Sequence, residues 1–323
     1  MRIRVASFNV KNLNMGNDEE SQKKRDYDEI ARLIHDYDIV VLQEVLSKNI
    51  IEGFSGRRET AVFTRRLGNH WEGKWIDPKT RSKMYPYLGE DKRGEGFAFL
   101  WNTQKIELVN ENGKDILPRR YSDYSPSPGT KQIRLIRDPG YGRFKIKNRP
   151  VEIRVITTHI IFGKPKQENV AVEIDQGAIS MRKNEFDVLA GRIYKKINDD
   201  HKTEKSVQAY TIIIGDYNLN LKGGDLSTAL IPEVSYYDQF GRPCIPAISQ
   251  TKMRTVQDDP TTIKADCSGY ANNFDHCTYS SETEHVIVNC YRNPAISGYS
   301  PDEIKEYRDT VSDHVPIVVE INC

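Results

Sequence analysis

The chain has no long hydrophobic run, and this absence limits the places where it can reside. Of its 323 residues 37% are hydrophobic, yet no apolar stretch approaches the roughly 18 residues that a membrane-spanning helix needs. Residues 1–15 also lack the long apolar segment of a secretory signal peptide. We therefore expect no membrane insertion and a cytoplasmic location, with secretion after removal of a leader as the alternative.

Cysteine is also scarce in this sequence. The five cysteines lie in the last quarter of the chain and form no C-x-x-C pair: Cys244, Cys267, Cys277, Cys290 and Cys323. Their odd number and scattered spacing argue against a zinc site and indicate reduced thiols, which fits a cytoplasmic protein.

An excess of charge of one sign is missing as well. The sequence has 47 Lys and Arg against 46 Asp and Glu, and its formal net charge is +1. Without an overall basic field, the composition does not indicate an obligate nucleic-acid binder. Local basic clusters could still form a patch, or could be solvated surface: Lys23-Lys24-Arg25, Arg57-Arg58, Arg65-Arg66 and Arg119-Arg120.

What the chain does have is a series of apolar, β-branched segments. They predict strands at 3–9, 39–43, 96–101, 106–109, 132–136, 143–147, 151–158, 210–215, 286–290 and 315–321. Helical periodicity predicts helices at 22–36, about 58–68 and 177–198. Polar stretches at 72–94, 110–131, 162–176 and 219–262 are expected to be loops that carry substrate recognition.

The segment Ile212 to Asn218 runs from an apolar strand into a carboxylate and a carboxamide. Asp216 and Asn218 stand two residues apart, so at a strand end both side chains point to the same side. They can converge on one phosphate, because Asp216 can take a proton and Asn218 can donate a hydrogen bond. Taken alone, such a pair also fits a turn or a helix cap.

Other strand ends carry polar residues of matching chemistry: Asn9, Glu44, His159 and Asp313-His314. Singly, each fits a cap, an edge histidine or a turn. Their joint occurrence at successive strand ends indicates one site. Because that site needs residues from both ends of the chain, we expect a single domain over residues 1–323.

These segments resemble the endonuclease/exonuclease/phosphatase superfamily, whose members include DNase I, the major AP endonucleases, inositol polyphosphate 5-phosphatases and bacterial sphingomyelinases. The motifs extend over residues 3–321, essentially the whole chain. The resemblance implies an α+β fold, a four-layer α/β/β/α sandwich in which two mixed β-sheets pack face to face between outer helices. The apolar strand at 210–215 fits this fold independently, because it needs cover on both faces.

Glu44 is the strongest candidate for a metal ligand, and a hard carboxylate with few soft neighbours favours Mg²⁺ or Mn²⁺. Asp313 is its expected partner across the site. Asn9 is expected to orient Glu44 or a metal-bound water and to contact the substrate phosphate. The resemblance implies that Asp216 positions or deprotonates the attacking water, and that Asn218 contacts the scissile phosphate.

Two histidines are expected to act as acid or base, and an imidazole does so only when its second nitrogen is fixed. The resemblance pairs Glu95 with His159. It pairs Asp275 with His314 in the same way. The neighbouring His276 is expected to be a packed structural histidine.

The segment Arg137-Asp138-Pro139 resembles the one with which DNase I-like nucleases grip a phosphate. A planar guanidinium suits that role because it can bind two oxygens at once. This feature favours a nuclease over a lipid phosphatase. Two departures from DNase I, at Arg93 and at Tyr270, imply that the groove contacts differ.

Together these features predict an Mg²⁺-dependent phosphodiesterase, a DNase I-like endonuclease that hydrolyses DNA with little base specificity. The first alternative is a phosphomonoesterase or phospholipase of the same superfamily, acting on an inositol phosphate, a nucleotide or sphingomyelin. The second is a non-catalytic binding module that keeps the fold. A basic rim would favour a polynucleotide substrate, whereas exposed aromatic loops would favour a lipid.

Overall fold

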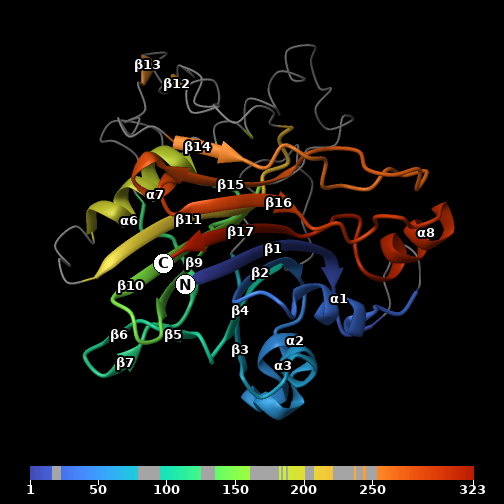
Figure 1. The fold of residues 1–323 in the computed structure, drawn as a ribbon, viewed down its shortest axis with the longest axis horizontal. Helices are drawn as coiled ribbons and strands as arrows, with labels where there is room; N and C mark the ends of the chain where they lie inside the picture. The colour runs from blue at the N-terminus through green and yellow to red at the C-terminus, as the bar shows by residue number, and fades with distance from the viewer. Residues whose placement is uncertain are drawn as a thin grey trace.

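Two stacked β-sheets with helices on their outer sides make up the molecule (Figure 1). The computed structural model describes residues 1–16, 23–78, 95–124, 135–160, 182, 185–186, 188–200, 207–220, 236–237, 243–244 and 253–323. Both sheets mix parallel and antiparallel pairs. The expected α/β/β/α sandwich is therefore confirmed.

The first sheet joins the two ends of the chain. Its strands run in the order β16 (Ile287–Arg292), β17 (Ile317–Asn322), β1 (Arg2–Leu13), β2 (Ile39–Val45), β4 (Gly96–Asn102) and β3 (Trp71–Ile76). The central strand β1 pairs antiparallel with β17 and parallel with β2, and Figure 1 shows the two termini close together. Because β1 and β2 are parallel, their polar carboxyl ends meet at one edge of the sheet.

The second sheet brings three polar strand ends into register. Its strands run in the order β14 (Met253–Val256), β15 (Asp275–Ser280), β11 (Gln208–Asp216), β10 (Val151–His159), β9 (Gly140–Ile146) and β5 (Ile106–Leu108), and β8 (Arg119–Arg120) also pairs with β9. In the parallel pair of β10 and β11, His159 lies opposite Asp216. Across the antiparallel pair with β15, Asp216 lies opposite Asp275.

Helices cover the outer faces, α1, α2, α3 and α8 on one side and α6 on the other (Figure 1). Their bounds are α1 (Tyr27–Ile34), α2 (Asn49–Glu52), α3 (Val62–Leu67), a π-helix η5 (Val188–Ile193), α6 (Tyr194–Asp200), α7 (Ser281–Glu284) and α8 (Pro301–Thr310), with two 3₁₀ turns, η1 (Phe54–Gly56) and η2 (Arg58–Thr60). Two short hairpins complete the described elements: β6 (Asn110–Glu111) with β7 (Lys114–Asp115), and β12 (Tyr236–Tyr237) with β13 (Pro243–Cys244).

The strands divide their side chains between two kinds of core, as the two-residue period of a strand requires. On β1, Ile3 and Val5 face the layer between the sheets, whereas Ala6 and Phe8 pack under the helices of the first sheet. On β11, Ile212 and Ile214 face the same inner layer, and Ile213 packs beneath η5 and α6. Cover on both faces explains why these strands are almost uniformly apolar.

Most of the strands predicted from apolar runs are confirmed, with bounds that shift by a few residues: β1, β2, β4, β5, β9, β10, β11, β16 and β17. The strand predicted at 132–136 is wrong where it can be compared, because Leu135 and Ile136 are not in a strand. Residues 132–134 lie outside the described residues. Of the predicted helices, 22–36 shortens to α1 and 58–68 becomes η2 and α3. The described part of 177–198 is helical, with residues 182 and 185–186, η5 and the start of α6.

Several strands and one helix lie in segments that were predicted to be loops or for which no element was predicted. The stretch 72–94 begins with most of β3, 110–131 contains two-residue strands, and 219–262 includes β14. Strand β15 was not predicted from the sequence, because its buried side chains are mostly polar and form no apolar run. Helix α8 was not predicted either, because few of its residues are apolar. The sequence does carry one signal for it, since Ser300 and Glu303 form a capping box at its N-terminus.

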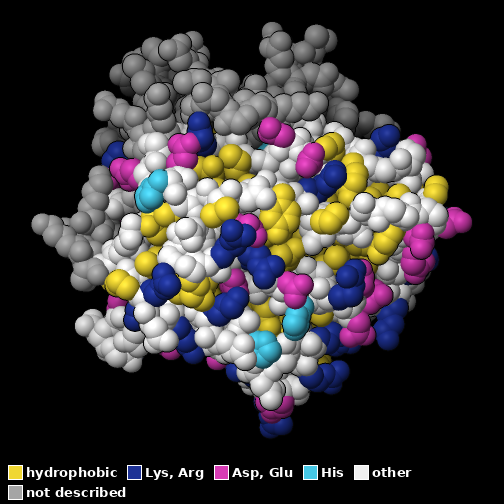
Figure 2. Space-filling model, in the orientation of Figure 1, with side chains coloured by type: hydrophobic (Ala, Val, Ile, Leu, Met, Phe, Trp, Pro, Cys, Tyr) yellow, Lys and Arg dark blue, Asp and Glu magenta, His cyan; other side chains and the backbone are white. Residues whose placement is uncertain are grey.

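On the face drawn in Figure 2, basic and acidic side chains alternate without a field of one sign, as the net charge of +1 suggests. In the part of the chain that the structure describes, no helix is both long and apolar enough to cross a bilayer.

Candidate active site

The predicted strand ends of both sheets meet at one edge of the sandwich. Asn9, at the inner face of β1, holds the two sheets together there. Its amide nitrogen Nδ2 donates to Glu44 Oε1 at 2.9 Å and to Asp216 Oδ2 at 3.0 Å. A single side chain therefore links the expected metal ligand of the first sheet to the expected base of the second.

Left-handed backbone conformations surround this junction. Glu44 has a φ of 60° and Asn218 a φ of 50°, and at the end of β1 both Lys11 and Asn12 are left-handed, with φ of 42° and 50°. Each such residue costs on the order of 1–3 kcal/mol and persists where surrounding contacts enforce it. Here the contacts are specific, because the Asn12 N–H donates to Glu44 Oε2 at 2.9 Å and the Lys11 N–H to Asn9 Oδ1 at 3.0 Å.

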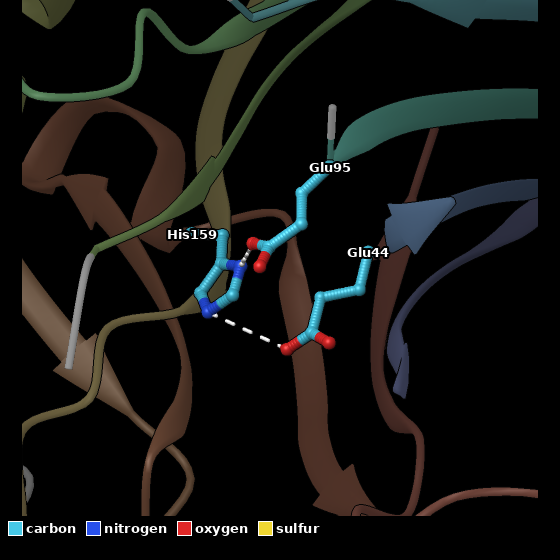
Figure 3. A group of neighbouring side chains, drawn as sticks. All are labelled: Glu44, Glu95 and His159. Atoms are coloured by element: carbon cyan, nitrogen blue, oxygen red, sulfur yellow. Dashed lines mark ion pairs between the residues drawn. The ribbon is translucent and has the colours of Figure 1, made fainter. Parts of the chain in front are cut away.

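Two carboxylates lie on either side of the His159 ring (Figure 3). Glu44 Oε1 is 3.7 Å from Nε2, and Glu95 Oε2 is 3.5 Å from Nδ1. The predicted partner Glu95 is thus beside His159. The hydrogen bond to Nδ1, at 2.9 Å, comes instead from Arg137 Nη1.

Arg137 determines the protonation of the His159 ring. A guanidinium has donors only, so Nδ1 must accept and the proton of the neutral ring sits on Nε2. Burial, together with the charges of Arg137 and His314, holds the pKa of His159 well below its usual 6.5. His159 is therefore a neutral ring that presents an Nε2–H group toward Glu44 and Asp216, from which it lies 3.7 and 3.6 Å away.

His314 has the opposite electrostatic setting. Its Nδ1 lies 2.8 Å from Asp275 Oδ2, and its Nε2 lies 3.7 Å from Asp216 Oδ2. Burial by itself lowers the pKa of His314, but the carboxylates of Asp275 and Asp216 outweigh it and raise the pKa to about 10. Asp275 is thus beside His314, as the sequence predicted. With its pKa raised to about 10, His314 is an imidazolium at neutral pH.

Asp216 lies between the two histidines and is 1% exposed. Burial raises the pKa of its carboxyl to about 7, with His314 opposing the rise and Asp275 adding to it. Its Oδ1 accepts from the Asn218 N–H at 2.8 Å. A carboxyl with a pKa near neutrality is suited to take a proton from water at that pH.

Three further residues predicted for the site form hydrogen bonds or ion pairs with other protein groups. Asn218 is 6% exposed and donates from Nδ2 to the Ile160 carbonyl at 2.7 Å. Arg137, predicted to grip a phosphate, is 5% exposed and has Nη2 at 2.5 Å from Glu95 Oε2. Asp313, predicted to share a metal with Glu44, pairs with Lys11 at 3.6 Å.

Two groups of donor atoms could hold a cation among the described residues. One is Glu44, Glu95 and His159, and the other is Asp216, Asp275 and His314. The first contains hard oxygen donors whose side chains are 14–15% exposed, which suits an ion that keeps waters. The second is buried, with the Asp275–His314 hydrogen bond occupying its centre. Within the first group Glu95 pairs with Arg137, so Glu44 is the carboxylate whose chemistry best fits the implied divalent metal.

Supporting residues were missed in the sequence because nothing local marks them. The fully buried Ser312 hydroxyl donates to the Asn9 carbonyl at 2.7 Å and accepts from the His314 N–H at 3.1 Å. Beneath the site, Gln43 Nε2 donates to Thr157 Oγ1 across the sheets at 2.9 Å. In the sequence, the signal for Gln43 and Ser312 was that they lie next to Glu44 and two residues before His314. His276 is fully buried against the carbonyls of Leu219 and Asn273, as a structural histidine should be.

Comparison with known proteins points to one family. A model of the Endonuclease/Exonuclease/phosphatase family matches residues 6–314. A protein from Thioalkalivibrio sp. (strain K90mix) named deoxyribonuclease is 23% identical over 325 residues, which is 98% of this chain and 70% of that protein.

Solved structures show the same fold. An endonuclease/exonuclease/phosphatase family protein from Bacteroides thetaiotaomicron aligns with a TM-score of 0.52 at 18% identity, covering 99% of this chain and 98% of that one. D. rerio TDP2 complexed with single strand DNA product aligns with a TM-score of 0.51 at 13% identity, covering 100% and 99%. Because the family model includes every strand end that supplies a site residue, the chain belongs to the Endonuclease/Exonuclease/phosphatase family, whose members are phosphoric ester hydrolases that typically use divalent metals.

Proposed function

We propose that this protein is an Mg²⁺-dependent endonuclease that hydrolyses phosphodiester bonds of DNA with little base specificity. The observation that carries the proposal is the convergence of Asn9, His159 and His314 on the Asp216 carboxylate, at 3.0, 3.6 and 3.7 Å. A buried carboxyl of raised pKa, a neutral N–H donor and an imidazolium are the parts that in-line hydrolysis of a phosphodiester requires.

In the proposed mechanism Asp216 accepts the proton of the attacking water. Its pKa of about 7 places it near the pH at which a base works best. Asn9 and the Asn218 N–H hold its two oxygens in place. Proton transfer to Asp216 leaves the oxygen of that water as the nucleophile that attacks the phosphorus.

The two histidines complete the reaction in different ways. His159 directs its Nε2–H at a phosphoryl oxygen, because Arg137 occupies its other nitrogen. The imidazolium of His314 donates its Nε2 proton to the departing oxygen, while Asp275 keeps the ring in orientation through Nδ1. A divalent ion at Glu44, when bound, would neutralise charge on the phosphoryl oxygens as a Lewis acid.

DNA as the substrate rests on two relatives and not on the surface charge. The Thioalkalivibrio relative is named a deoxyribonuclease, and D. rerio TDP2 has been solved with a single-stranded DNA product. The predicted phosphate grip of Arg137 gives less support, since its guanidinium contacts Glu95 and His159.

The test is a substrate panel under matched conditions. Supercoiled plasmid, an RNA of similar length and a set of phosphomonoesters would each be incubated in Mg²⁺, with and without EDTA. Asp216→Asn, purified in parallel, controls for contaminating nucleases. We expect wild-type protein to nick and then linearise the plasmid, and EDTA to stop the reaction. Phosphate release from a monoester with intact plasmid would establish the phosphatase alternative instead.

A further inference from the structure

Arg182 and Glu185 are two buried charged residues that the proposed mechanism does not use. Both are helical and precede η5, with exposed fractions of 7% and 5%. Because they stand three residues apart on a helix, they face the same side. Each side chain contacts the backbone of a different segment of the site. Arg182 Nη1 donates to the Asn218 carbonyl at 2.9 Å, and Glu185 Oε1 accepts from the Ile136 N–H at 2.6 Å.

Arg182 fixes the turn that follows β11. Asn218 is left-handed in this turn, with a φ of 50°. Its N–H donates to Asp216 Oδ1 at 2.8 Å, and its side chain donates to the Ile160 carbonyl at 2.7 Å. The guanidinium supplies the partner for the Asn218 carbonyl, and a buried carbonyl without a partner would cost about 1–3 kcal/mol. The contact therefore stabilises the turn whose N–H orients the proposed base, Asp216.

Glu185 fixes the segment that carries Arg137. Residues 135–138 belong to no helix or strand, so the position of this segment depends on contacts with other parts of the chain. The Ile136 N–H donates to Glu185, and the next residue, Arg137, donates from Nη1 to His159 Nδ1 at 2.9 Å. That second bond decides which nitrogen of the ring carries the proton. Glu185 therefore acts on the His159 ring through the backbone of Ile136 and the side chain of Arg137.

We propose that Arg182 and Glu185 are positioning residues, and that their helical turn sets the alignment of Asp216 with His159. The inference rests on the proposed function, because the two groups need this alignment only if both act on one phosphodiester. The contacts fit the role, since one face of the helix holds the turn after β11 and the segment that carries Arg137. Misplacing a reacting group by about 1 Å can cost about a hundredfold in rate. Side chains that touch no substrate can therefore control turnover.

Turnover tests Arg182. Arg182→Met keeps the aliphatic stem and removes the donors, so kcat for cleavage of a DNA duplex should fall by about a hundredfold. KM should change far less, because the substrate still binds and only the alignment in the transition state is lost. Arg182→Lys keeps a donor for the Asn218 carbonyl and should recover most of the rate. The control is Arg58→Met, which should keep the wild-type kcat. Arg58 Nη2 also donates to a backbone carbonyl, that of Asn69 at 2.9 Å, but at the end of the first sheet opposite Glu95.

The tautomer of the His159 ring tests Glu185 without any substrate. Long-range ¹⁵N–¹H spectra of the imidazole distinguish a proton on Nε2 from a proton on Nδ1, and the His159 signals are assigned by their loss in His159→Gln. Glu185→Met removes the acceptor for the Ile136 N–H, so the ring should change from the Nε2–H tautomer to a mixture of both, with a lowered kcat. Glu185→Gln keeps an acceptor oxygen and should restore the Nε2–H tautomer and most of the rate.

An unchanged kcat in folded Arg182→Met, or an unchanged tautomer in folded Glu185→Met, overturns the positioning role of that residue. If a Met variant does not fold, Arg182→Gln and Glu185→Asp replace it, because they stay polar but have a shorter reach. A wild-type protein that cleaves no duplex overturns the proposed function. The tautomer in Glu185→Met then still decides whether Glu185 positions the His159 ring.

Discussion

The two ends of strand β10 hold charged groups in opposite ways. Near its beginning, Glu152 is 2% exposed and lies between two arginines. Its Oε1 accepts from Arg143 Nε at 2.7 Å and from Arg154 Nε at 2.8 Å, and its Oε2 accepts from Arg143 Nη2 at 2.9 Å. At the other end of the same strand, His159 lies among carboxylates at 3.5 to 3.7 Å.

The pKa values of the two ends differ accordingly. Burial alone would raise the pKa of Glu152, but the two guanidinium groups outweigh it and lower the pKa below 4.5. At the other end burial dominates, raising the pKa of Asp216 to about 7 and lowering that of His159. Both carboxyl groups are almost fully buried, so the neighbouring charges make the difference. Two guanidinium groups outweigh burial at Glu152, whereas at Asp216 the charge of His314 does not, and Asp275 adds to the rise.

The comparison separates charges that stabilise the fold from charges that would serve the proposed chemistry. Substitutions at the two ends should therefore have opposite consequences, with activity lost at one end and stability lost at the other.

The largest effect is expected for Glu44→Gln. The change removes a charged oxygen donor that the metal needs, while the amide keeps the size of the side chain and can keep one of its two hydrogen bonds, from the Asn12 N–H or from Asn9 Nδ2. We expect Mg²⁺-dependent hydrolysis to be abolished, while loss of the other hydrogen bond costs only about 1 kcal/mol of stability and the protein stays folded. Turnover across an Mg²⁺ titration and a thermal melt measure the two quantities.

Glu72→Gln is the control for that substitution, because the Glu72 side chain is 44% exposed and pairs with Arg58 at the surface. Near-normal turnover of Glu44→Gln at low Mg²⁺ would exclude Glu44 as a metal ligand. It would also contradict the assignment of the charges at the His159 end of β10 to the proposed chemistry.

His159→Ala and His314→Ala should each lower the chemical rate by about two to four orders of magnitude, the usual contribution of a positioned proton donor or acceptor. The double variant should lose less than the product of the two, because both rings serve one transition state. Single-turnover cleavage of a short duplex measures the rate. The control is His35→Ala, since the His35 side chain is 55% exposed. A single variant that retains more than about a tenth of the rate would make its histidine structural.

Glu152→Gln should have the smallest effect on turnover and act on stability instead. The substitution removes the one carboxylate that both arginines share, although Arg143 keeps its pair with Glu111. We expect a loss of about 3 kcal/mol in the free energy of unfolding at pH 7. Because the folded pKa of Glu152 lies below 4.5, its contribution is complete above that pH and is lost as the pH falls through the folded value.

Denaturant unfolding of both proteins between pH 7 and pH 3 tests this, and the difference between them should shrink only at the acid end. Turnover below the melting temperature should stay within about twofold of wild type, as for a residue remote from the chemistry. A large drop in turnover with unchanged stability would show that the two ends of β10 are not independent.

The sequence by itself determined the fold class and the chemical types at the strand ends. Apolar runs such as Ile212 to Ile214 specify strands covered on both faces, and the residue after such a run lies at an edge whatever the partner strand is. The residue types Asn9, Glu44, Asp216 and His314 could therefore be identified as one site before any contact was known. The polar strand β15 could not, because nothing apolar marks it.

Only the tertiary structure decided how those residues share charge. Whether Asp216 has a pKa near 4 or near 7 depends on its burial and on groups 59 and 98 residues away, at Asp275 and His314. The contact of Arg137 with His159 and that of Lys11 with Asp313 arise from strand register and a backbone bulge. Electrostatic interactions act through space. The sequence therefore specifies which ionisable groups are present, and the packing of the two sheets determines their protonation states.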